Sequence, residues 1–340
     1  TPGEILMRDM HKPRRIRIDA STICQLNCPS CPGSSGATRS GLGLGFLSLR
    51  NFEQVLDDNP FVREVELSNY GEIFLNPELV GIMRAAHERR VRLTADTGVN
   101  LNTANEEQLE GLVRYRVCSV SCSIDGASAD TYKRYRVHGD FDRVIRNIES
   151  INAYKRRYQS PYPLLTWQFI VFGHNEHEIS LARRRAVELN MRFRLKLSWD
   201  ETFSPVRNPG LVRREIGYAS RSEYRLQHGI DQVYGICRDL WERPQINWDG
   251  RVLGCSRNFW RTFSGNAFSD GLVPTLNTED MAAARAMLSG EPGVRADVAC
   301  STCDIYRDRV ATGRFVNRSR HEVLLRNVSR LLRRYRPGWR

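Results

Sequence analysis

The sequence predicts an α/β fold, in which a parallel sheet, either a partial (β/α)6 TIM-like barrel or a doubly wound sheet, is followed by a smaller C-terminal α+β domain. Three observations predict it. Short β-rich runs alternate with longer amphipathic stretches from about residue 14 to residue 200. A stretch with two prolines and a glycine, residues 204–210, then ends this alternation. Beyond it the periodicity is weak, and four of the nine cysteines appear.

The β-rich runs and the helix-like stretches follow one another in a regular order. The expected strands are residues 15–20, 62–68, 91–96, 117–124, 165–172 and 193–198. Helix-like stretches lie between them, at residues 77–90, 105–113, 141–157 and 176–189. Strands that alternate with helices form a parallel sheet with crossover helices. An open barrel and a doubly wound sheet both fit this alternation, and periodicity alone does not choose between them.

Composition narrows the class of protein. The chain has 340 residues, of which 41% are hydrophobic and 26% are charged, as is typical of a globular protein. No apolar run approaches the roughly eighteen residues of a membrane span, and the first residues lack the apolar core of a signal peptide. We therefore expect a cytoplasmic protein, divided into residues 1–203, residues 204–312 and a basic C-terminal helix or tail, residues 313–340.

The net charge of +12 comes mostly from arginines, many of which lie in the C-terminal tail. A solvated helix face and a docking surface for an acidic partner both explain this charge. The sequence contains no zinc-finger or RRM signature, so we do not expect a nucleic acid partner.

Three cysteines directly follow the first expected strand: Cys24, Cys28 and Cys31. Their loop lies at the carboxyl end of a parallel sheet, where α/β proteins place active sites. Three thiolates can hold three irons of a [4Fe–4S] cube and leave the fourth iron open. A structural zinc ion normally takes a fourth protein ligand, and none lies nearby in sequence. Zinc binding and buried free thiols remain the alternatives.

The C-x3-C-x2-C spacing after a first strand resembles the radical S-adenosylmethionine (radical SAM) superfamily. The resemblance implies that the open iron binds the amino and carboxylate groups of S-adenosylmethionine. One electron, from a flavodoxin- or ferredoxin-like donor, then cleaves this cofactor to methionine and a 5′-deoxyadenosyl radical. Many members carry an aromatic residue just before the third cysteine, whereas this chain has Ser30.

Shorter motifs at the later strand ends resemble the cofactor-binding positions of that superfamily. Gly71 and Glu72 match the motif that binds the cofactor's amino group, with Ile73 in place of the usual proline. Arg136 stands where relatives often carry an arginine for the cofactor's carboxylate, although a surface arginine is the alternative. Ser123 and Asp125 look like ribose contacts, and Gln168 is the weakest candidate. The full set of cofactor-binding residues that the resemblance implies is Gly71, Glu72, Thr97, Ser123, Asp125, Arg136 and Gln168.

The strand at residues 117–124 also carries two cysteines. Period-two alternation puts Ser123 and Asp125 on one face of this strand and turns Cys118 and Cys122 toward the helices. We therefore expect Cys118 and Cys122 to be core residues rather than hydrogen-atom donors.

Four more cysteines lie beyond the linker: Cys237, Cys255, Cys300 and Cys303. An Asp249-Gly250 turn before Cys255 resembles the hairpin of SPASM and twitch domains, which follow many radical SAM barrels. The resemblance implies one auxiliary [4Fe–4S] cluster with all four irons ligated. Such a cluster has no open iron, so it conducts electrons or supports the substrate pocket. A structural zinc site with four thiolates is the alternative.

These features together predict an oxidoreductase that abstracts hydrogen from a small sugar, polyol or aminocyclitol-like substrate. A single auxiliary cluster suits dehydrogenation, whereas epimerisation needs a hydrogen donor. Modification of a ribosomally made peptide is the alternative reaction, and we expect no leader-peptide-binding module before Arg15. An iron–sulfur or zinc binding protein is the non-enzyme alternative. Candidate substrate contacts are Trp199, Asp200, Arg257 and Asn258.

Overall fold

The computed structural model describes residues 10–316. The predicted basic tail lies outside these residues, apart from its first four positions. None of the helices within residues 10–316 has the length and apolarity that a membrane span requires.

A single curved sheet of eight strands organises the fold, in the order β6-β5-β4-β3-β2-β1-β7-β8. The first six strands all run parallel, and they are β1 (Arg15–Ile18), β2 (Glu64–Glu66), β3 (Arg92–Val99), β4 (Ser119–Ser123), β5 (Leu164–Val171) and β6 (Arg192–Leu197). Each lies beside the next in sequence, without the reversal of order that a doubly wound sheet has. The sheet is not closed, so the predicted partial barrel is confirmed.

The chain beyond the linker continues the same sheet. Strand β7 (Gln245–Ile246) pairs in parallel with β1, and β8 (Val252–Gly254) returns antiparallel to β7. The main hydrophobic core includes both Ile16 of β1 and Met281 of the C-terminal region. The carboxyl end of β1 is therefore fixed from both sides, by β2 and by the region that holds the later cysteines.

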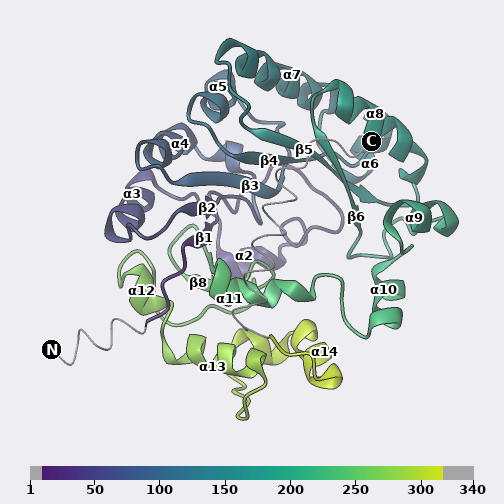
Figure 1. Ribbon diagram of the computed structural model, residues 1–340. Helices are drawn as coiled ribbons and strands as arrows, with labels where there is room; N and C mark the ends of the chain where they lie inside the picture. The colour runs from purple at the N-terminus through teal and green to yellow at the C-terminus, as the bar shows by residue number, and fades with distance from the viewer. Residues whose placement is uncertain (1–9, 317–340) are drawn as a thin grey trace.

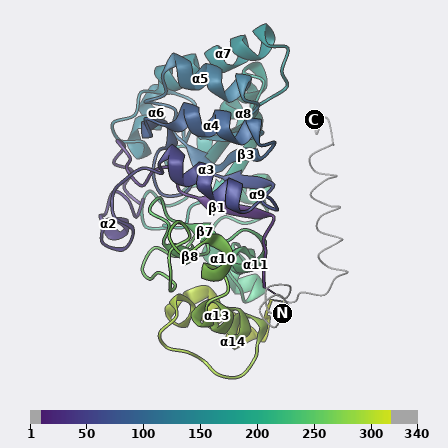
Figure 2. The ribbon, with the colours of Figure 1, turned by 90° about the vertical axis from the view of Figure 1, so that its left-hand side faces the viewer.

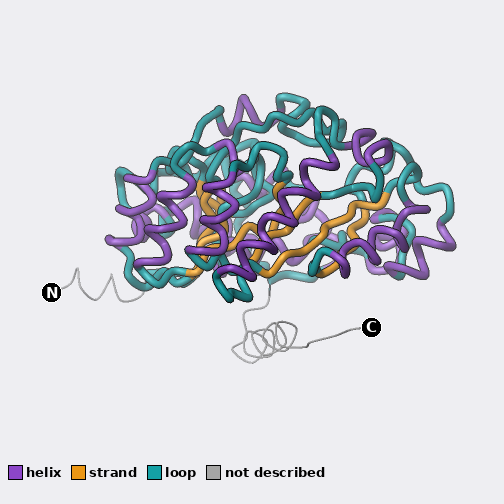
Figure 3. The backbone as a smooth tube through the Cα atoms, turned by 90° about the horizontal axis from the view of Figure 1, so that it is seen from above, coloured by secondary structure: helices purple, strands orange, loops and turns teal. Residues whose placement is uncertain are grey.

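Helices cover the outer side of the sheet, as Figure 1 shows. The barrel helices are α2 (Ala37–Leu42), α3 (Leu49–Asp58), α4 (Leu79–Glu88), α5 (Glu106–Arg114), α6 (Ala129–Tyr135), α7 (Phe141–Arg157) and α8 (Ile179–Glu188). Of these, α2 lies apart from the outer row, in the segment that follows β1. The C-terminal region contributes α9 (Pro209–Ile216), α10 (Arg221–His228), α11 (Asp239–Glu242), α12 (Leu272–Thr275), α13 (Glu279–Ser289) and α14 (Asp304–Thr312). Figure 2 places α13 and α14 at the end of the molecule next to β7 and β8. Figure 3 shows the strands between these helices and long loop segments.

Capping residues start several of the barrel helices. The side chains of Ser48, Ser128 and Asp140 each accept a hydrogen bond from a backbone N–H in the first turn of α3, α6 and α7. Asn105 forms a reciprocal capping box with Gln108 at the start of α5. Each such cap stabilises a helix by about 1 kcal/mol, and it fixes where the preceding loop must end.

Candidate functional site

A cavity of about 1170 Å³, including the space open to solvent, lies at the carboxyl ends of the parallel strands. Its lining comes from the ends of all six barrel strands or from the loops that follow them. This position, at the carboxyl ends of parallel strands, is where α/β proteins bind their ligands.

The three cysteines after β1 all line this cavity. Cys28 is buried, and its Sγ atom lies 3.7 Å from Nη1 of Arg136, while Sγ of Cys24 lies 3.7 Å from Nδ2 of Asn100. Burial raises the pKa of the Cys24 thiol to about 12 and also raises the pKa of Cys28. Free thiols at this site therefore stay protonated, and a metal that binds them must displace protons.

The composition of the lining suits an iron–sulfur cluster with one open iron. Among the described lining residues there is no fourth cysteine and no histidine that could complete a four-coordinate zinc site. No group of three or more His, Cys, Asp or Glu side chains within residues 10–316 is positioned to hold a single metal ion. The donor set of Cys24, Cys28 and Cys31 thus fits the cluster that the sequence predicts.

Glu72 lies on the cavity wall next to the cysteine loop. Its Oε2 atom accepts a hydrogen bond of 2.6 Å from the backbone N–H of Asn100, and its Oε1 atom accepts one of 3.3 Å from Phe74. Burial raises the pKa of Glu72 to about 7. A cation bound in the cavity would restore the ionised carboxylate, so the site is suited to an ammonium group. The preceding Gly71 is required because a Cβ there would collide with the backbone carbonyl of Ser21.

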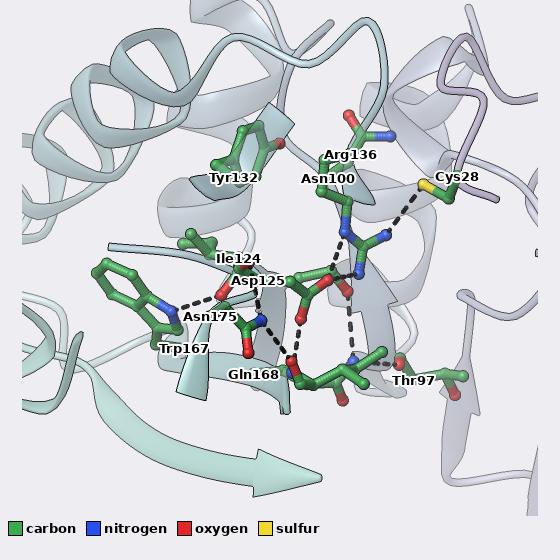
Figure 4. A network of polar contacts seen from close by, with 12 residues as sticks. Cys28, Thr97, Asn100, Ile124, Asp125, Tyr132, Arg136, Trp167, Gln168 and Asn175 are labelled. Carbon is green, nitrogen blue, oxygen red and sulfur yellow. Dashed lines mark hydrogen bonds and ion pairs between the residues drawn. The ribbon is translucent and has the colours of Figure 1, made fainter. Parts of the chain in front are cut away.

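Arg136 is held in place by a buried carboxylate, as Figure 4 shows. Oδ2 of Asp125 accepts hydrogen bonds from Nε of Arg136 at 2.7 Å and from Nη2 at 2.6 Å. Oδ1 of Asp125 accepts a third bond, of 2.6 Å, from the backbone N–H of Ile170. Asp125 is 0% exposed and lies behind the cavity wall rather than on it. The structure therefore places Asp125 as the partner that orients Arg136, with both of its oxygens engaged in hydrogen bonds.

Three further predicted residues meet at the ends of β3, β4 and β5. Nε2 of Gln168 lies 3.4 Å from both the carbonyl oxygen of Thr97 and Oγ of Ser123. All three residues line the cavity. The neighbouring Gly98 has a φ of 141°, and a Cβ there would collide with Oγ of Ser123. The structure thus brings together six of the seven predicted cofactor residues, and Asp125 is the exception.

Only one of the four candidate substrate residues reaches this cavity. Trp199 lines it and is 55% exposed. Asp200 lies in a neighbouring cavity, where it accepts a 2.7 Å hydrogen bond from Ser30. Arg257 and Asn258 line the cavity of the later cysteines. Asn258 is buried and donates to the carbonyls of Leu253 and Arg261, so it supports the hairpin instead of facing the main cavity.

Sequence reasoning missed Lys196 on β6, Asn100 after β3 and Arg39 on α2, which all line the cavity. A signal for Lys196 was present, because charged and apolar residues alternate along Arg192–Leu197. That alternation usually marks a face turned to solvent. Here the curvature of the sheet turns the charged face toward the interior of the barrel.

The four later cysteines line a second cavity, of about 390 Å³ including open space: Cys237, Cys255, Cys300 and Cys303. Beside them lies the guanidinium of Arg309, a residue that is only 2% exposed. Nε of Arg309 is 3.3 Å from Sγ of Cys237, and its other nitrogens donate to the carbonyls of Arg314 and Tyr234. Within residues 10–316, no carboxylate lies within ion-pair distance of Arg309. A buried cation needs a counter-charge, and a metal-bound thiolate at Cys237 would provide it.

The two cysteine sites are joined through the backbone of Ser256, the neighbour of Cys255. Its carbonyl oxygen accepts a hydrogen bond of 2.8 Å from the hydroxyl of Tyr70 and one of 3.1 Å from Nδ2 of Asn69. Tyr70 and Asn69 both line the main cavity. A change in either site can therefore reach the other through this contact.

Asp19 directly follows β1, and it gives a pH-dependent prediction. Its carboxylate is fully buried, and burial raises its pKa to about 8 despite the opposing charge of Arg17. The folded state therefore holds a proton that the unfolded state has lost, and stability falls as the pH rises from about 4 to about 8. We expect Asp19→Asn to remove this decline, which amounts to several kcal/mol.

The measurement is the free energy of unfolding by denaturant between pH 5 and pH 9, compared between wild type and Asp19→Asn. Asp57→Asn is the control, because Asp57 is exposed and the hydrogen bond from Arg89 lowers its pKa. Parallel pH profiles of wild type and Asp19→Asn would contradict the prediction.

Comparison with known proteins agrees with the sequence resemblance. Residues 18–183 match the model of the Radical SAM superfamily. The AdoMet-dependent heme synthase of Methanosarcina barkeri is 28% identical over 179 residues, which are 52% of this chain and 48% of that protein. The chain thus matches about half the length of this curated relative.

Solved structures share the fold. SuiB of Streptococcus suis bound to S-adenosylmethionine superposes with a TM-score of 0.62, at 14% identity over 90% of this chain and 74% of SuiB. SuiB bound to its precursor peptide SuiA gives a TM-score of 0.58, at 12% identity over 90% of this chain and 73% of SuiB. At such identities the likeness concerns the fold alone.

Proposed function

We propose that the chain is a radical SAM enzyme, since residues 18–183 match the model of that superfamily, and that it cleaves S-adenosylmethionine reductively and abstracts a hydrogen atom from a bound substrate. The observation that carries this proposal is the convergence of Cys24, Cys28 and Cys31 with Gly71 and Glu72 in one cavity. When bound there, a [4Fe–4S] cluster and S-adenosylmethionine supply a 5′-deoxyadenosyl radical as the hydrogen acceptor.

The residues around the three cysteines divide the binding of the cofactor among them. In this proposal, Glu72 and the backbone near Gly71 bind the amino group of the cofactor. Arg136, whose guanidinium is oriented by Asp125, binds the carboxylate of the cofactor. The linked polar groups of Thr97, Ser123 and Gln168 suit the nucleoside part of the cofactor. The backbone at Gly71 and Gly98 can approach the cofactor closely because neither residue carries a Cβ.

A small aromatic cluster buries Cys28 of the cysteine loop. Leu26, Cys28, Tyr135 and Phe172 form a buried group of their own, against which Phe203 packs. The ring centroids of Tyr135 and Phe172 are 4.5 Å apart. Because a radical must be kept from water and stray reductants, this cluster supports the assignment of the cavity as the reaction site.

We propose further that residues 204–312 hold one auxiliary [4Fe–4S] cluster on Cys237, Cys255, Cys300 and Cys303, while residues 1–203 bind the cofactor. The buried cation at Arg309 favours metal-bound thiolates over neutral thiols at this second site. A fully ligated cluster supplies an electron acceptor for a substrate radical. The activity that fits best is oxidation of a small sugar, polyol or aminocyclitol, with a flavodoxin- or ferredoxin-like electron donor.

The proposed function is tested with anaerobically reconstituted protein, dithionite and candidate substrates labelled with deuterium. We expect 5′-deoxyadenosine to form and to gain deuterium from the true substrate at one position. Transfer from a peptide and from no small molecule would favour the alternative of peptide modification. Absence of 5′-deoxyadenosine with every substrate class would leave an iron–sulfur or zinc binding protein.

The metal content tests the auxiliary site separately. Two cubane clusters hold about eight irons per chain, and we expect Cys303→Ala to retain about four of them together with cleavage of the cofactor. Ser301→Ala is the matched control, because Ser301 lies between the two cysteines and its hydroxyl donates only to backbone carbonyls. Four irons and one zinc in the wild type would contradict the auxiliary cluster.

A further inference from the structure

Lys196 is a charged residue in the cavity to which the proposed function gives no role. It lies on β6 beside Ile170 of β5 and lines the cavity. Among the described residues, its ammonium has neither a hydrogen-bond partner nor an ion-pair partner. The preceding inward residue, Arg194, is by contrast held by hydrogen bonds of 2.6 Å to Oε1 of Gln168 and 3.2 Å to Oγ of Ser121. Among the described residues, Lys196 is therefore a cation without a partner in the cavity that we propose as the ligand site.

The neighbouring acids are already engaged. The groups whose charges act on Lys196 are Arg194 on its own strand, Asp125 after β4, Arg136 after α6 and Arg221 on α10. The only acid among them, Asp125, is bound by both Arg136 and the backbone of Ile170. Within residues 10–316, these contacts therefore leave no free anion beside Lys196.

The charges of the cavity as a whole point in the same direction. Its charged lining consists of Arg39, Glu72, Arg136 and Lys196, and Arg136 is neutralised by Asp125 behind the wall. The cofactor carries a sulfonium and an ammonium against one carboxylate, and a three-thiolate [4Fe–4S]²⁺ cluster carries one negative charge. These two groups together add no net charge. The lining then has two positive charges, on Arg39 and Lys196, and one negative charge, on Glu72. One positive charge of the lining therefore remains unmatched.

We propose that the substrate carries an anionic oxygen group, a carboxylate or a phosphate, and that Lys196 binds it. This inference rests on the proposed function and narrows it, since a substrate with free amino groups would add positive charge to a cavity that already has an excess. Trp199 lies three residues further on and offers an exposed indole face to the same ligand. The substrate class is thus an acidic or phosphorylated polyol in place of an aminocyclitol.

The protonation of Lys196 agrees with such a role. Its pKa is lowered to about 8, first by burial and then by Arg194. Lys196 is exposed and lines the cavity, so an anion bound there would offset both effects. We therefore expect binding of an anion to raise the pKa of Lys196.

The test uses the anaerobically reconstituted full chain, with S-adenosylhomocysteine in the cofactor site, and four matched probes. These are glucose, glucosamine, glucuronate and glucose 6-phosphate, whose affinities are measured by calorimetry. We expect one of the two anionic probes to bind about tenfold or more tightly than the neutral and cationic ones, as a charge-assisted hydrogen bond provides. Lys196→Met should lose this preference, and Lys196→Arg should retain most of it.

Two controls test whether the effect is specific to Lys196 and whether it concerns the probe or the cofactor. Lys133→Met makes the same substitution on the exposed side of α6, where Lys133 pairs with Asp130, and it should bind the probes like wild type. S-adenosylhomocysteine should bind equally to wild type and Lys196→Met. If Lys196→Met weakens S-adenosylhomocysteine instead, Lys196 binds the cofactor's carboxylate and the inference is wrong.

The inference also fails if wild type shows no preference for anions, or if Lys196→Met keeps it. Formation of 5′-deoxyadenosine by wild type is measured separately on the same protein preparation, with S-adenosylmethionine and dithionite in place of S-adenosylhomocysteine. Cleavage without a preference for anionic probes refutes only the role of Lys196, whereas absence of cleavage refutes the proposed function itself.

Discussion

Replacing Cys28 by alanine is expected to abolish formation of 5′-deoxyadenosine and to remove about half of the bound iron. Cys28 is buried between the aromatic cluster and Arg136, and only two thiols would remain among the described residues that line the cavity. Changes that merely disturb the orientation of metal ligands already cost about 10–100-fold. Loss of a ligand should therefore cost more than about a hundredfold in the cleavage rate.

The measurement is 5′-deoxyadenosine by chromatography, together with iron content after anaerobic reconstitution. Cys118→Ala serves as the control, because it removes a half-buried thiol that lines neither cysteine cavity. Full iron content and wild-type cleavage in Cys28→Ala would exclude the first cluster from the positions that we assign.

Replacing Arg136 by methionine is expected to have two separate effects, on stability and on cofactor affinity. The variant leaves the fully buried carboxylate of Asp125 without its partner, and breaking a buried pair in this way costs about 3–5 kcal/mol. It also removes the cation that we assign to the cofactor's carboxylate. A lost hydrogen bond between charged groups lowers affinity by roughly tenfold to a hundredfold.

The double variant Asp125→Asn with Arg136→Met distinguishes these effects. It removes both charges, so most of the lost stability should return, while the affinity for S-adenosylhomocysteine should stay low. Unfolding by denaturant and calorimetric titration provide the two readouts. Arg134→Met, an exposed change on the same helix, is the control. If the double variant recovers both stability and affinity, then Arg136 has only a structural role.

Much of the barrel follows from patterns that lie close together in the sequence. The alternation of strands and helices predicts β1 to β6 in order, and the expected helix at residues 141–157 coincides with α7. Strands β7 and β8 contain only two and three residues. The pairing of β7 with β1 joins residues more than 220 positions apart, and no local periodicity encodes such a contact.

The site was predictable where a single residue type determines the chemistry, as for the three cysteines and Gly71. It was less predictable where two side chains decide a role together. Period-two alternation predicts that Asp125 shares a face with Ser123, but it does not reveal that Arg136 and the backbone N–H of Ile170 occupy its two oxygens. Lys196 was missed because a charged strand face indicates solvent until the curvature of the sheet is known.

The burial of Arg309 beside Cys237 has a consequence for the lifetime of the protein. With the proposed auxiliary cluster bound, this cation would have its counter-charge, and its contacts join Tyr234 to Arg314. If oxygen destroyed that cluster, the thiols would regain their protons and the cation would be left unmatched in the interior. We expect the damaged region to open and to be cleaved by proteases before the barrel is, so that oxidised molecules are removed selectively from the cell's pool.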